Sequence, residues 1–188
     1  IEEGVNYITG DIARLGKDKS VFMAWSGWRV IEVIEKQTTL VNESVDIINA
    51  LAKKRNVNRD NIIVDEDGVG GGVKDYLKCK GFVNNSAPIE NGVQKENFAN
   101  LKTQCYYKLA EQINMNNLYV NCDEFQEKLL KEELEMVRLA KEVDTSKITL
   151  MSKDEVKKKI GRSPDYSDAL MMRMYFTLHK SKSYYYIG

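Results

Sequence analysis

The chain has 188 residues, 43% of them hydrophobic, which suits one domain with a full core. Lysine plus arginine and aspartate plus glutamate number 28 each, so no net charge draws the whole chain to nucleic acid or a membrane. Three cysteines without metal-ligand spacing and a single histidine argue against a zinc site, and no apolar run approaches the roughly 20 residues of a membrane span. We expect a single intracellular domain over residues 1–188. Because the chain begins at Ile1 in a strand-like run, we also expect an excised C-terminal piece of a longer protein.

The first part of the chain predicts three consecutive strands. Apolar and β-branched residues mark them at 5–12, 20–25 and 29–38, and the short turns between them indicate an antiparallel meander. A helix is expected over 41–56, where apolar residues recur at intervals of three and four. A buried strand follows at 61–65.

The middle of the chain alternates turns and helices. A glycine-rich turn at 68–72 leads into a short helix over 73–80 that ends at Gly81, and residues 84–97 have the composition of a loop. A helical stripe then runs from Phe98 to Ile113.

The last part predicts a brief strand at 118–120, a helix over 125–139, a hairpin arm at 147–151 and a closing helix over 164–179. Three meandering strands followed by helix, strand, helix and a closing helix are typical of an RNase H-like α/β fold. We therefore expect a mixed central sheet, with an antiparallel meander plus parallel strands, flanked by helices.

Four aspartates lie at element boundaries. Asp11 ends the first strand, Asp65 ends the buried strand, and Asp165 and Asp168 open the closing helix. Carboxylate oxygens are the ligands that hard divalent cations prefer. The pattern therefore predicts a metal-dependent nuclease site.

The glycine turn fails as a phosphate-binding loop. In both the Walker A and the dinucleotide pattern, counting from Gly68, Val73 stands where a glycine is required, and Lys74 is followed by Asp75. The simpler interpretation is that the glycines permit a tight turn and a close approach of helix to strand.

Each aspartate also has a purely structural interpretation. Asp11 suits a turn hydrogen bond at a strand end. Asp165 suits the first turn of a helix capped by Ser163 with Pro164 at its first position. Asp168 fits this interpretation less well, because an apolar run follows it and places it near the buried edge of the helix.

Taken together, the motifs resemble those of a known family, the C-terminal nuclease domain of the tailed-phage terminase large subunit. The resemblance covers most of the chain, whereas the family's ATPase motor, with its Walker motifs, is absent from it. The matching segments are GDIARLGKD at 10–18, VDEDGVGGGV at 64–73, SKDE at 152–155 and GRSPDYSDAL at 161–170.

The resemblance implies roles for the acidic residues. Asp11, Asp65 and Asp168 correspond to the family's catalytic metal ligands, and Asp165 stands where a further ligand often contributes. Two Mg²⁺ or Mn²⁺ ions would then clamp the attacking and leaving oxygens of a phosphodiester. Asp67 is a weaker substitute for Asp65, because it lies beyond the strand end, where the turn has already begun.

Basic residues near the closing motif are candidates for DNA contact. The family keeps a lysine in a hairpin, which resembles Lys153, although a solvated lysine is an equal alternative. A basic run of this kind is usually a solvated helix face, but its closeness to the aspartates favours phosphate contact. The run comprises Lys157, Lys158, Lys159 and Arg162.

The family resemblance implies an endonuclease that cuts concatemeric double-stranded DNA during viral genome packaging, in the cytoplasm of the infected bacterial host. Its implied partners are the ATPase domain in cis, the small terminase subunit and the portal protein, and no membrane. The alternatives are another RNase H-like nuclease such as a junction resolvase, a non-catalytic adaptor that binds DNA or a motor, and a nucleotide-binding module.

Overall fold

The computed structural model describes residues 4–13, 18–37, 40–90, 97–140 and 147–179. They form a six-stranded mixed sheet in the order β5-β4-β1-β2-β3-β6. Strands β1, β2 and β3 pair antiparallel, while β4, β5 and β6 join in parallel, which confirms the predicted meander plus parallel strands. The strands are β1 (Asn6–Asp11), β2 (Ser20–Ser26), β3 (Arg29–Lys36), β4 (Ile62–Asp65), β5 (Lys80–Phe82) and β6 (Tyr119–Val120).

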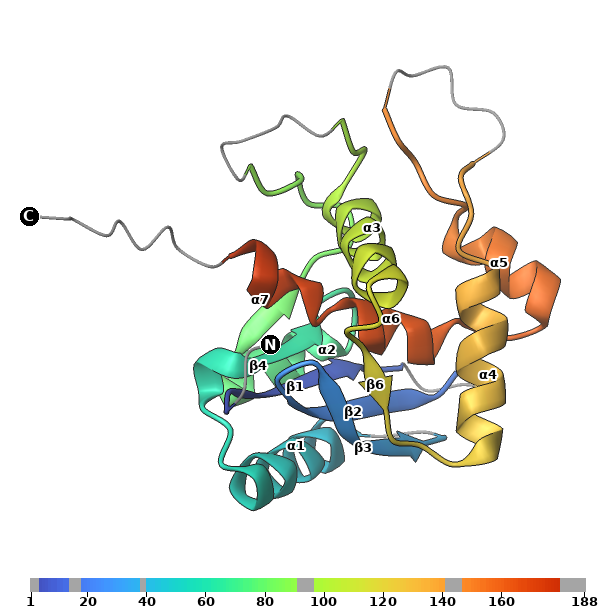
Figure 1. The fold of residues 1–188 in the computed structure, drawn as a ribbon. Coiled ribbons are helices and arrows are strands. Elements are labelled where there is room, and N and C mark those ends of the chain that lie inside the picture. The colour runs from blue at the N-terminus through green and yellow to red at the C-terminus, as the bar shows by residue number, and fades with distance from the viewer. Residues whose placement is uncertain (1–3, 14–17, 38–39, 91–96, 141–146, 180–188) are drawn as a thin grey trace, which may run out of the picture.

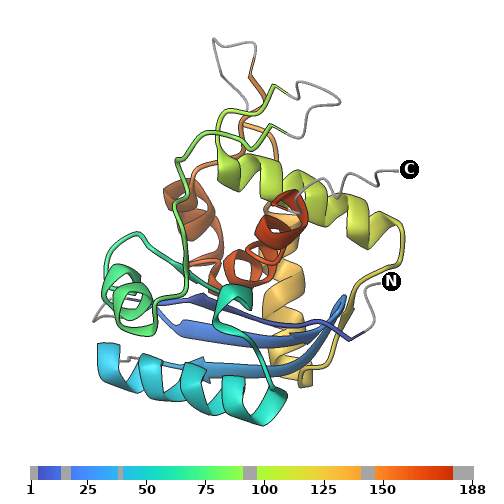
Figure 2. The same ribbon diagram turned by 90° about the vertical axis from the view of Figure 1, so that its left-hand side faces the viewer.

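Helices cover both faces of the sheet (Figures 1 and 2). Helices α1 and α2 pack on one face, and α3, α4, α6 and α7 contribute to the core on the other. The helices are α1 (Val41–Arg55), the 3-10 turn η1 (Arg59–Asn61), α2 (Gly70–Leu77), α3 (Leu101–Asn114), α4 (Glu124–Glu135), α5 (Lys153–Ile160), α6 (Asp165–Met171) and α7 (Met174–Leu178).

Strand alternation divides the core into two clusters. Successive side chains of a strand point to opposite faces. Ile8, Phe22 and Val64 accordingly join the cluster under α1 and α2, whereas Tyr7 and Ile63 join the cluster under α3, α6 and α7. The parity places Asp11, two residues beyond Thr9, on the same face of the sheet as α6.

The glycine turn has the structural role that the sequence predicts. Gly68 has φ +91°, a conformation that favours glycine, and a Cβ added to Gly70 would lie 1.7 Å from the carbonyl oxygen of Asp65. Helix α2 therefore starts against the backbone of β4, and only a glycine permits this approach.

Several element boundaries differ from the sequence prediction. Helix α2 begins at Gly70 and ends at Leu77, and residues 80–82, at and just beyond the end of the predicted helix, form β5. Parallel pairing with β4 overrides the weak strand propensity of this short segment. Helix α4 ends at Glu135, and Leu139 instead bridges to Leu150, in line with the predicted hairpin arm.

The closing helix is divided into α6 and α7, which the sequence does not predict. The break falls at Met172–Arg173. The guanidinium of Arg173 is fully buried and lies over the rings of Tyr7 and Trp28, at 3.8 and 4.6 Å from their centroids. The helix is therefore interrupted where its one buried arginine turns onto the β1 and β2–β3 aromatic residues.

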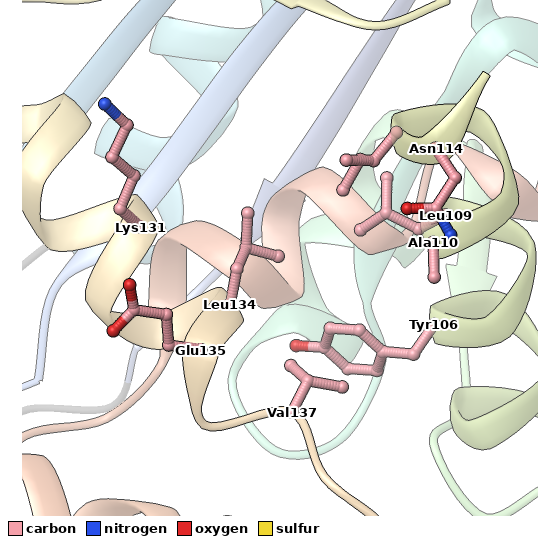
Figure 3. A pocket seen from close by; sticks show the side chains of 9 residues that line it. Tyr106, Leu109, Ala110, Asn114, Lys131, Leu134, Glu135 and Val137 are labelled. Carbon is pink, nitrogen blue, oxygen red and sulfur yellow. The ribbon is translucent and has the colours of Figure 1, made fainter. Parts of the chain in front are cut away.

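The structure adds one helix and one cleft that the sequence does not predict. Helix α5 was not predicted, and none of the described helices is long and apolar enough to cross a membrane. A mostly apolar cleft of about 370 Å³ lies between α3 and α4 and contains none of the four aspartates (Figure 3). The tyrosine run at 184–186 lies outside the described residues.

Candidate active site

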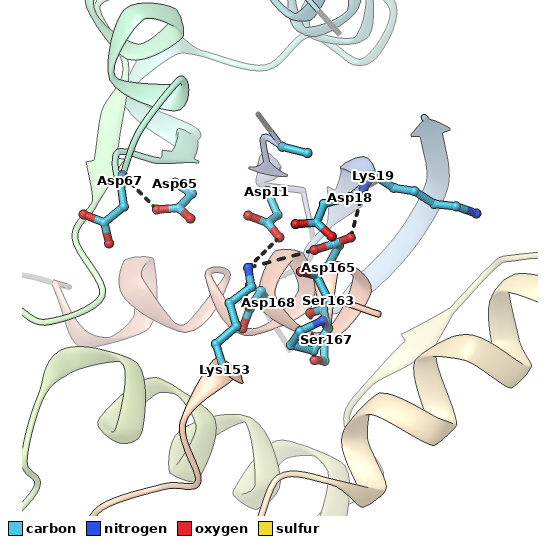
Figure 4. A network of polar contacts seen from close by, with 12 residues as sticks. Asp11, Asp18, Lys19, Asp65, Asp67, Lys153, Ser163, Asp165, Ser167 and Asp168 are labelled. Carbon is cyan, nitrogen blue, oxygen red and sulfur yellow. Dashed lines mark hydrogen bonds and ion pairs between the residues drawn. The ribbon is translucent and has the colours of Figure 1, made fainter. Parts of the chain in front are cut away.

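The sheet brings Asp11 and Asp65 side by side. Strands β1 and β4 are parallel neighbours, with Gly10 opposite Val64, so the next residue of each strand is one of these aspartates. Asp11 is 4% exposed and Asp65 is half-buried. Both carboxylates stand at the carboxyl edge of the sheet, where parallel strands present their functional side chains (Figure 4).

Helix α6 supplies the other two carboxylates from above this edge. Asp165 and Asp168 are both buried, and α6 packs on β1 and β2. The backbone N–H of Lys19 donates to Oδ2 of Asp165 at 3.1 Å, which ties the helix start to the beginning of β2. Helix α6 begins at Asp165, with Pro164 rather than Ser163 in the capping position.

The ammonium group of Lys153 lies among three of the carboxylates. Its Nζ is 3.1 Å from Oδ2 of Asp168, 3.6 Å from Oδ2 of Asp11 and 3.9 Å from Oδ1 of Asp165 (Figure 4). Carboxylates this close together would repel one another and hold the site open if no cation lay among them. Instead, an internal cation compensates the charges and keeps the carboxylates together.

The carboxylate oxygens of this site are suitable ligands for a hard divalent cation. The distances between them in this structure fit the ammonium group of Lys153. Carboxylate oxygens are the ligands that Mg²⁺ and Mn²⁺ prefer. Among the described residues, no three acidic, histidine or cysteine side chains are close enough together to hold an ion. An ion here requires Lys153 to leave the position it occupies between Asp11 and Asp168.

The same residue type has opposite pKa shifts within this site. Burial, reinforced by the charge of Asp11, raises the pKa of Asp65 to about 7 and that of Asp165 to about 8. Burial also raises the pKa of Asp11. Burial opposes the charge of Asp168 too, but Lys102 and Lys153 outweigh it and hold that pKa below its usual range.

Helix α3 contributes two partners that sequence reasoning missed. Lys102 Nζ and the hydroxyl of Tyr106 each lie 2.7 Å from Oδ1 of Asp168. The two residues are one helical turn apart, beside the apolar stripe that predicts α3. A lysine and a tyrosine at that spacing are common on helices, and only the fold shows which carboxylate they meet.

Asp67 supports Asp65 rather than replacing it. The backbone N–H of Asp67 donates to Oδ1 of Asp65 at 3.0 Å, and the exposed Asp67 carboxylate accepts from the Asn84 side chain at 2.8 Å. Asn84 also donates to Oδ1 of Asp65 at 3.3 Å. Sequence reasoning missed Asn84, which follows β5.

The predicted basic run divides into two groups. Lys158 and Lys159 are exposed on α5. Lys157 forms an ion pair with Asp18 at 2.7 Å. Arg162 reaches α4, where it contacts Glu132 at 2.8 Å, the backbone oxygen of Leu129 and the buried carboxylate of Glu133.

Glu133 links α4 to the start of α6. It is fully buried, and its Oε2 accepts the backbone N–H of Ser167 at 2.7 Å. Burial raises the pKa of Glu133 to about 7, although the Ser167 N–H and Arg162 oppose the shift. A buried glutamate of a helix rich in charged residues thus helps to hold the helix that carries Asp168.

A cleft of about 410 Å³ adjoins Asp168. Its floor includes Asp168 and Lys153, and its walls come from the segment after β5, the first turns of α3 and the segment before α5. The polar wall residues are Asn84, Asn85, Asn100, Lys102, Thr103, Thr149 and Ser152.

No family model and no curated protein sequence matches the chain. Solved structures do match it. The nuclease domain of the large terminase subunit gp2 of bacterial virus Sf6 has a TM-score of 0.78 and 25% identity, covering 92% of this chain and 88% of that one. A lysine-to-alanine mutant of that domain, with manganese and beta-thujaplicinol, has a TM-score of 0.80 and 24% identity, covering 93% and 89%.

A more distant match has the same fold. The large terminase nuclease from thermophilic phage G20c, with bound magnesium, has a TM-score of 0.61 and 15% identity, covering 91% of this chain and 80% of that one. Matches of this extent span nearly the whole sheet and its helices. The chain therefore has the RNase H-like fold of the nuclease domains of phage large terminase subunits.

Proposed function

We propose that this chain is the nuclease domain of a phage terminase large subunit, a metal-dependent endonuclease that cuts concatemeric double-stranded DNA. The observation that carries this proposal is the convergence of three carboxylates on the ammonium of Lys153, with the carboxylate of Asp65 on the strand next to that of Asp11. The four carboxylates come from two strands and a helix, and they are Asp11, Asp65, Asp165 and Asp168.

Asp11, Asp65 and Asp168 would hold the divalent ions, with Asp165 as a further ligand. Two Mg²⁺ or Mn²⁺ ions at such a site polarise the phosphate oxygens and lower the pKa of an attacking water. The protein's part is to hold the carboxylates in place, through strand pairing for Asp11 and Asp65 and through α6 for the others.

Metal use is supported by the neighbouring structures. Structures of the Sf6 terminase nuclease domain contain manganese or calcium, and a structure of the G20c domain contains magnesium. These Sf6 structures with metal are of a lysine-to-alanine mutant. In this chain, Lys153 compensates the carboxylates without metal, and its displaced ammonium would be within reach of a bound phosphate.

The DNA would pass over the acidic residues along the 410 Å³ cleft, and the exposed Lys158 and Lys159 of α5 would be free to contact phosphate. Lys157 and Arg162 have acidic partners, so we propose that they hold α5 and α6 in place and contact phosphate less. Contacts from lysines to phosphate carry no base information, so little sequence specificity is expected. The ATPase domain, the small subunit and the portal are the proposed partners, in the cytoplasm of an infected bacterium.

Plasmid cleavage tests the proposal. The wild-type chain is incubated with supercoiled DNA and Mn²⁺, Mg²⁺ or EDTA, beside an Asp65→Asn variant that keeps size and loses charge. Cutting that requires metal and is lost in the variant supports the nuclease. Equal cutting by both proteins assigns the activity to a contaminant. Metal binding without cutting by either favours a non-catalytic DNA-binding role.

A further inference from the structure

One oxygen of Asp168 is held by two side chains of α3. Lys102 Nζ and Tyr106 Oη each lie 2.7 Å from Oδ1. Residues four apart on a helix lie on one face, so this pair forms a single grip one turn long. The hydroxyl of Ser167, on α6, also contacts the Tyr106 hydroxyl at 3.0 Å.

Lys102 and Tyr106 lie on a well-anchored part of α3. Tyr106 is 5% exposed and the Lys102 side chain 20% exposed. Asn100 caps α3 by accepting the backbone N–H of Thr103 at 2.9 Å, and the backbone N–H of Lys102 donates to the oxygen of Asn84 at 3.2 Å. The start of α3 is thereby fixed to the segment that also contacts Asp65.

The other oxygen of Asp168 has a different partner. Oδ2 lies 3.1 Å from Nζ of Lys153, whose side chain is 40% exposed and leaves the first residue of α5. This partner also shares its charge with Asp11 and Asp165. Oδ1 therefore has two largely buried partners. Oδ2 has one partner, which is more exposed and also contacts two other carboxylates.

We propose that Lys102 is a positioning residue that, together with Tyr106, reserves Oδ1 of Asp168 and leaves Oδ2 alone to bind a divalent ion. The inference rests on the proposed nuclease site. It makes Asp168 a one-oxygen ligand of fixed direction. It also places a permanent positive charge beside the ion, so the protein gives up metal affinity in return for ligand geometry.

The positioning role predicts opposite changes in Mn²⁺ affinity and cleavage rate, which a merely structural role does not. Removing an ordinary outer partner of a metal ligand costs about 10–100-fold in affinity or activity. A Lys102→Gln variant removes a repulsive charge and frees Oδ1. We expect it to bind Mn²⁺ roughly tenfold more tightly, and to cleave DNA about 10–100-fold more slowly at saturating Mn²⁺ because the carboxylate is free to turn.

The experiment measures Mn²⁺ binding by calorimetry without DNA, and cleavage as a function of Mn²⁺ concentration. Lys102→Arg keeps the charge and should restore wild-type affinity and most of the rate. Lys108→Gln is the matched control, because Lys108 lies on the same helix and pairs with Glu111 at 3.0 Å. It should leave both quantities unchanged.

Tyr106→Phe provides a second test that keeps the ring and the helix packing. It removes one of the two hydrogen bonds to Oδ1, so the cleavage rate should fall while Mn²⁺ affinity does not. If Mn²⁺ affinity falls together with rate in Lys102→Gln and Tyr106→Phe, or stays unchanged in Lys102→Gln, the positioning role is overturned. If the wild-type chain itself binds no Mn²⁺, the proposed nuclease site fails instead, and the two failures are distinguished.

Discussion

The acidic site has a strand end, formed by Asp11 and Asp65, and a helix end, formed by Asp165 and Asp168. The two ends are held in place by different means. Asp11 and Asp65 are brought together by strand register, since β1 and β4 are paired neighbours up to the residue before each, and Lys153 and Asn84 then contact their side chains. Asp168 is placed by side chains from α3 and α5, and its helix by a glutamate from α4. Accordingly, the pKa of Asp65 is raised to about 7 while that of Asp168 is lowered. Burial also raises the pKa of Asp165 at the helix end, to about 8, so the lowered pKa belongs to Asp168 alone, beside Lys102 and Lys153.

The largest expected effect is the loss of cleavage when either end loses a ligand. Asp11→Asn and Asp168→Asn should each lower metal-dependent DNA cleavage roughly a thousandfold, because each removes a charged oxygen from the proposed metal site, whose residues would act as a unit. The measurement is initial plasmid nicking in Mn²⁺. Asp60→Asn is the control, since Asp60 is exposed and lies on η1. Activity retained by only one of the variants would show that the two ends do not form one site.

The next effect is on the helix end alone. Arg162→Ala should lower the free energy of unfolding by about 3 kcal/mol, because it leaves the buried Glu133 carboxylate without its cationic partner. Denaturant unfolding at pH 8 measures the change. Lys159→Ala, an exposed neighbour on α5, should change it by under about 0.5 kcal/mol. Equal effects of the two variants would contradict the assignment of Arg162 to the α4–α6 contact.

Glu133 also makes the helix end sensitive to pH. Its pKa in the folded protein is raised to about 7 from the ordinary 4.5, so the folded state binds more protons than the unfolded state between these values. Its contribution to stability is therefore present below pH 4.5 and lost as the pH rises through 7. The stability difference between wild type and Glu133→Gln should shift by about 2 kcal/mol against wild type from pH 5 to pH 8. A difference that does not change with pH would show that Glu133 is charged throughout.

The sequence predicts the strand end of this site better than the helix end. An aspartate at the end of a buried strand is readable, and the fold order then indicates which strands are neighbours. Lys102, Tyr106 and Glu133 are ordinary members of amphipathic helices, and nothing local distinguishes them from their neighbours. They gain their roles only through contacts across 29 to 66 sequence positions. Strand β5 and the break at Arg173 were missed for the same reason, since sheet pairing and ring contacts decide them.

The smallest expected effect concerns Lys153, which joins the two ends. Lys153→Ala should lower the stability of the metal-free protein by only about 1–2 kcal/mol, because the side chain is 40% exposed and water partly replaces it. Asp65 and Asp165, with pKa values already raised to about 7 and 8, can also take up protons in its place.

The effect of Mn²⁺ on stability distinguishes charge compensation by Lys153 from a simple loss of packing. In Lys153→Ala the ion no longer competes with an ammonium for Asp11 and Asp168, so Mn²⁺ should stabilise the variant more than the wild type. Thermal unfolding with and without Mn²⁺ measures both shifts. A variant that Mn²⁺ stabilises less than wild type would show that Lys153 helps to bind the ion. The ammonium would then be a partner of the metal at this site, and the strand and helix ends would be joined by both cations together.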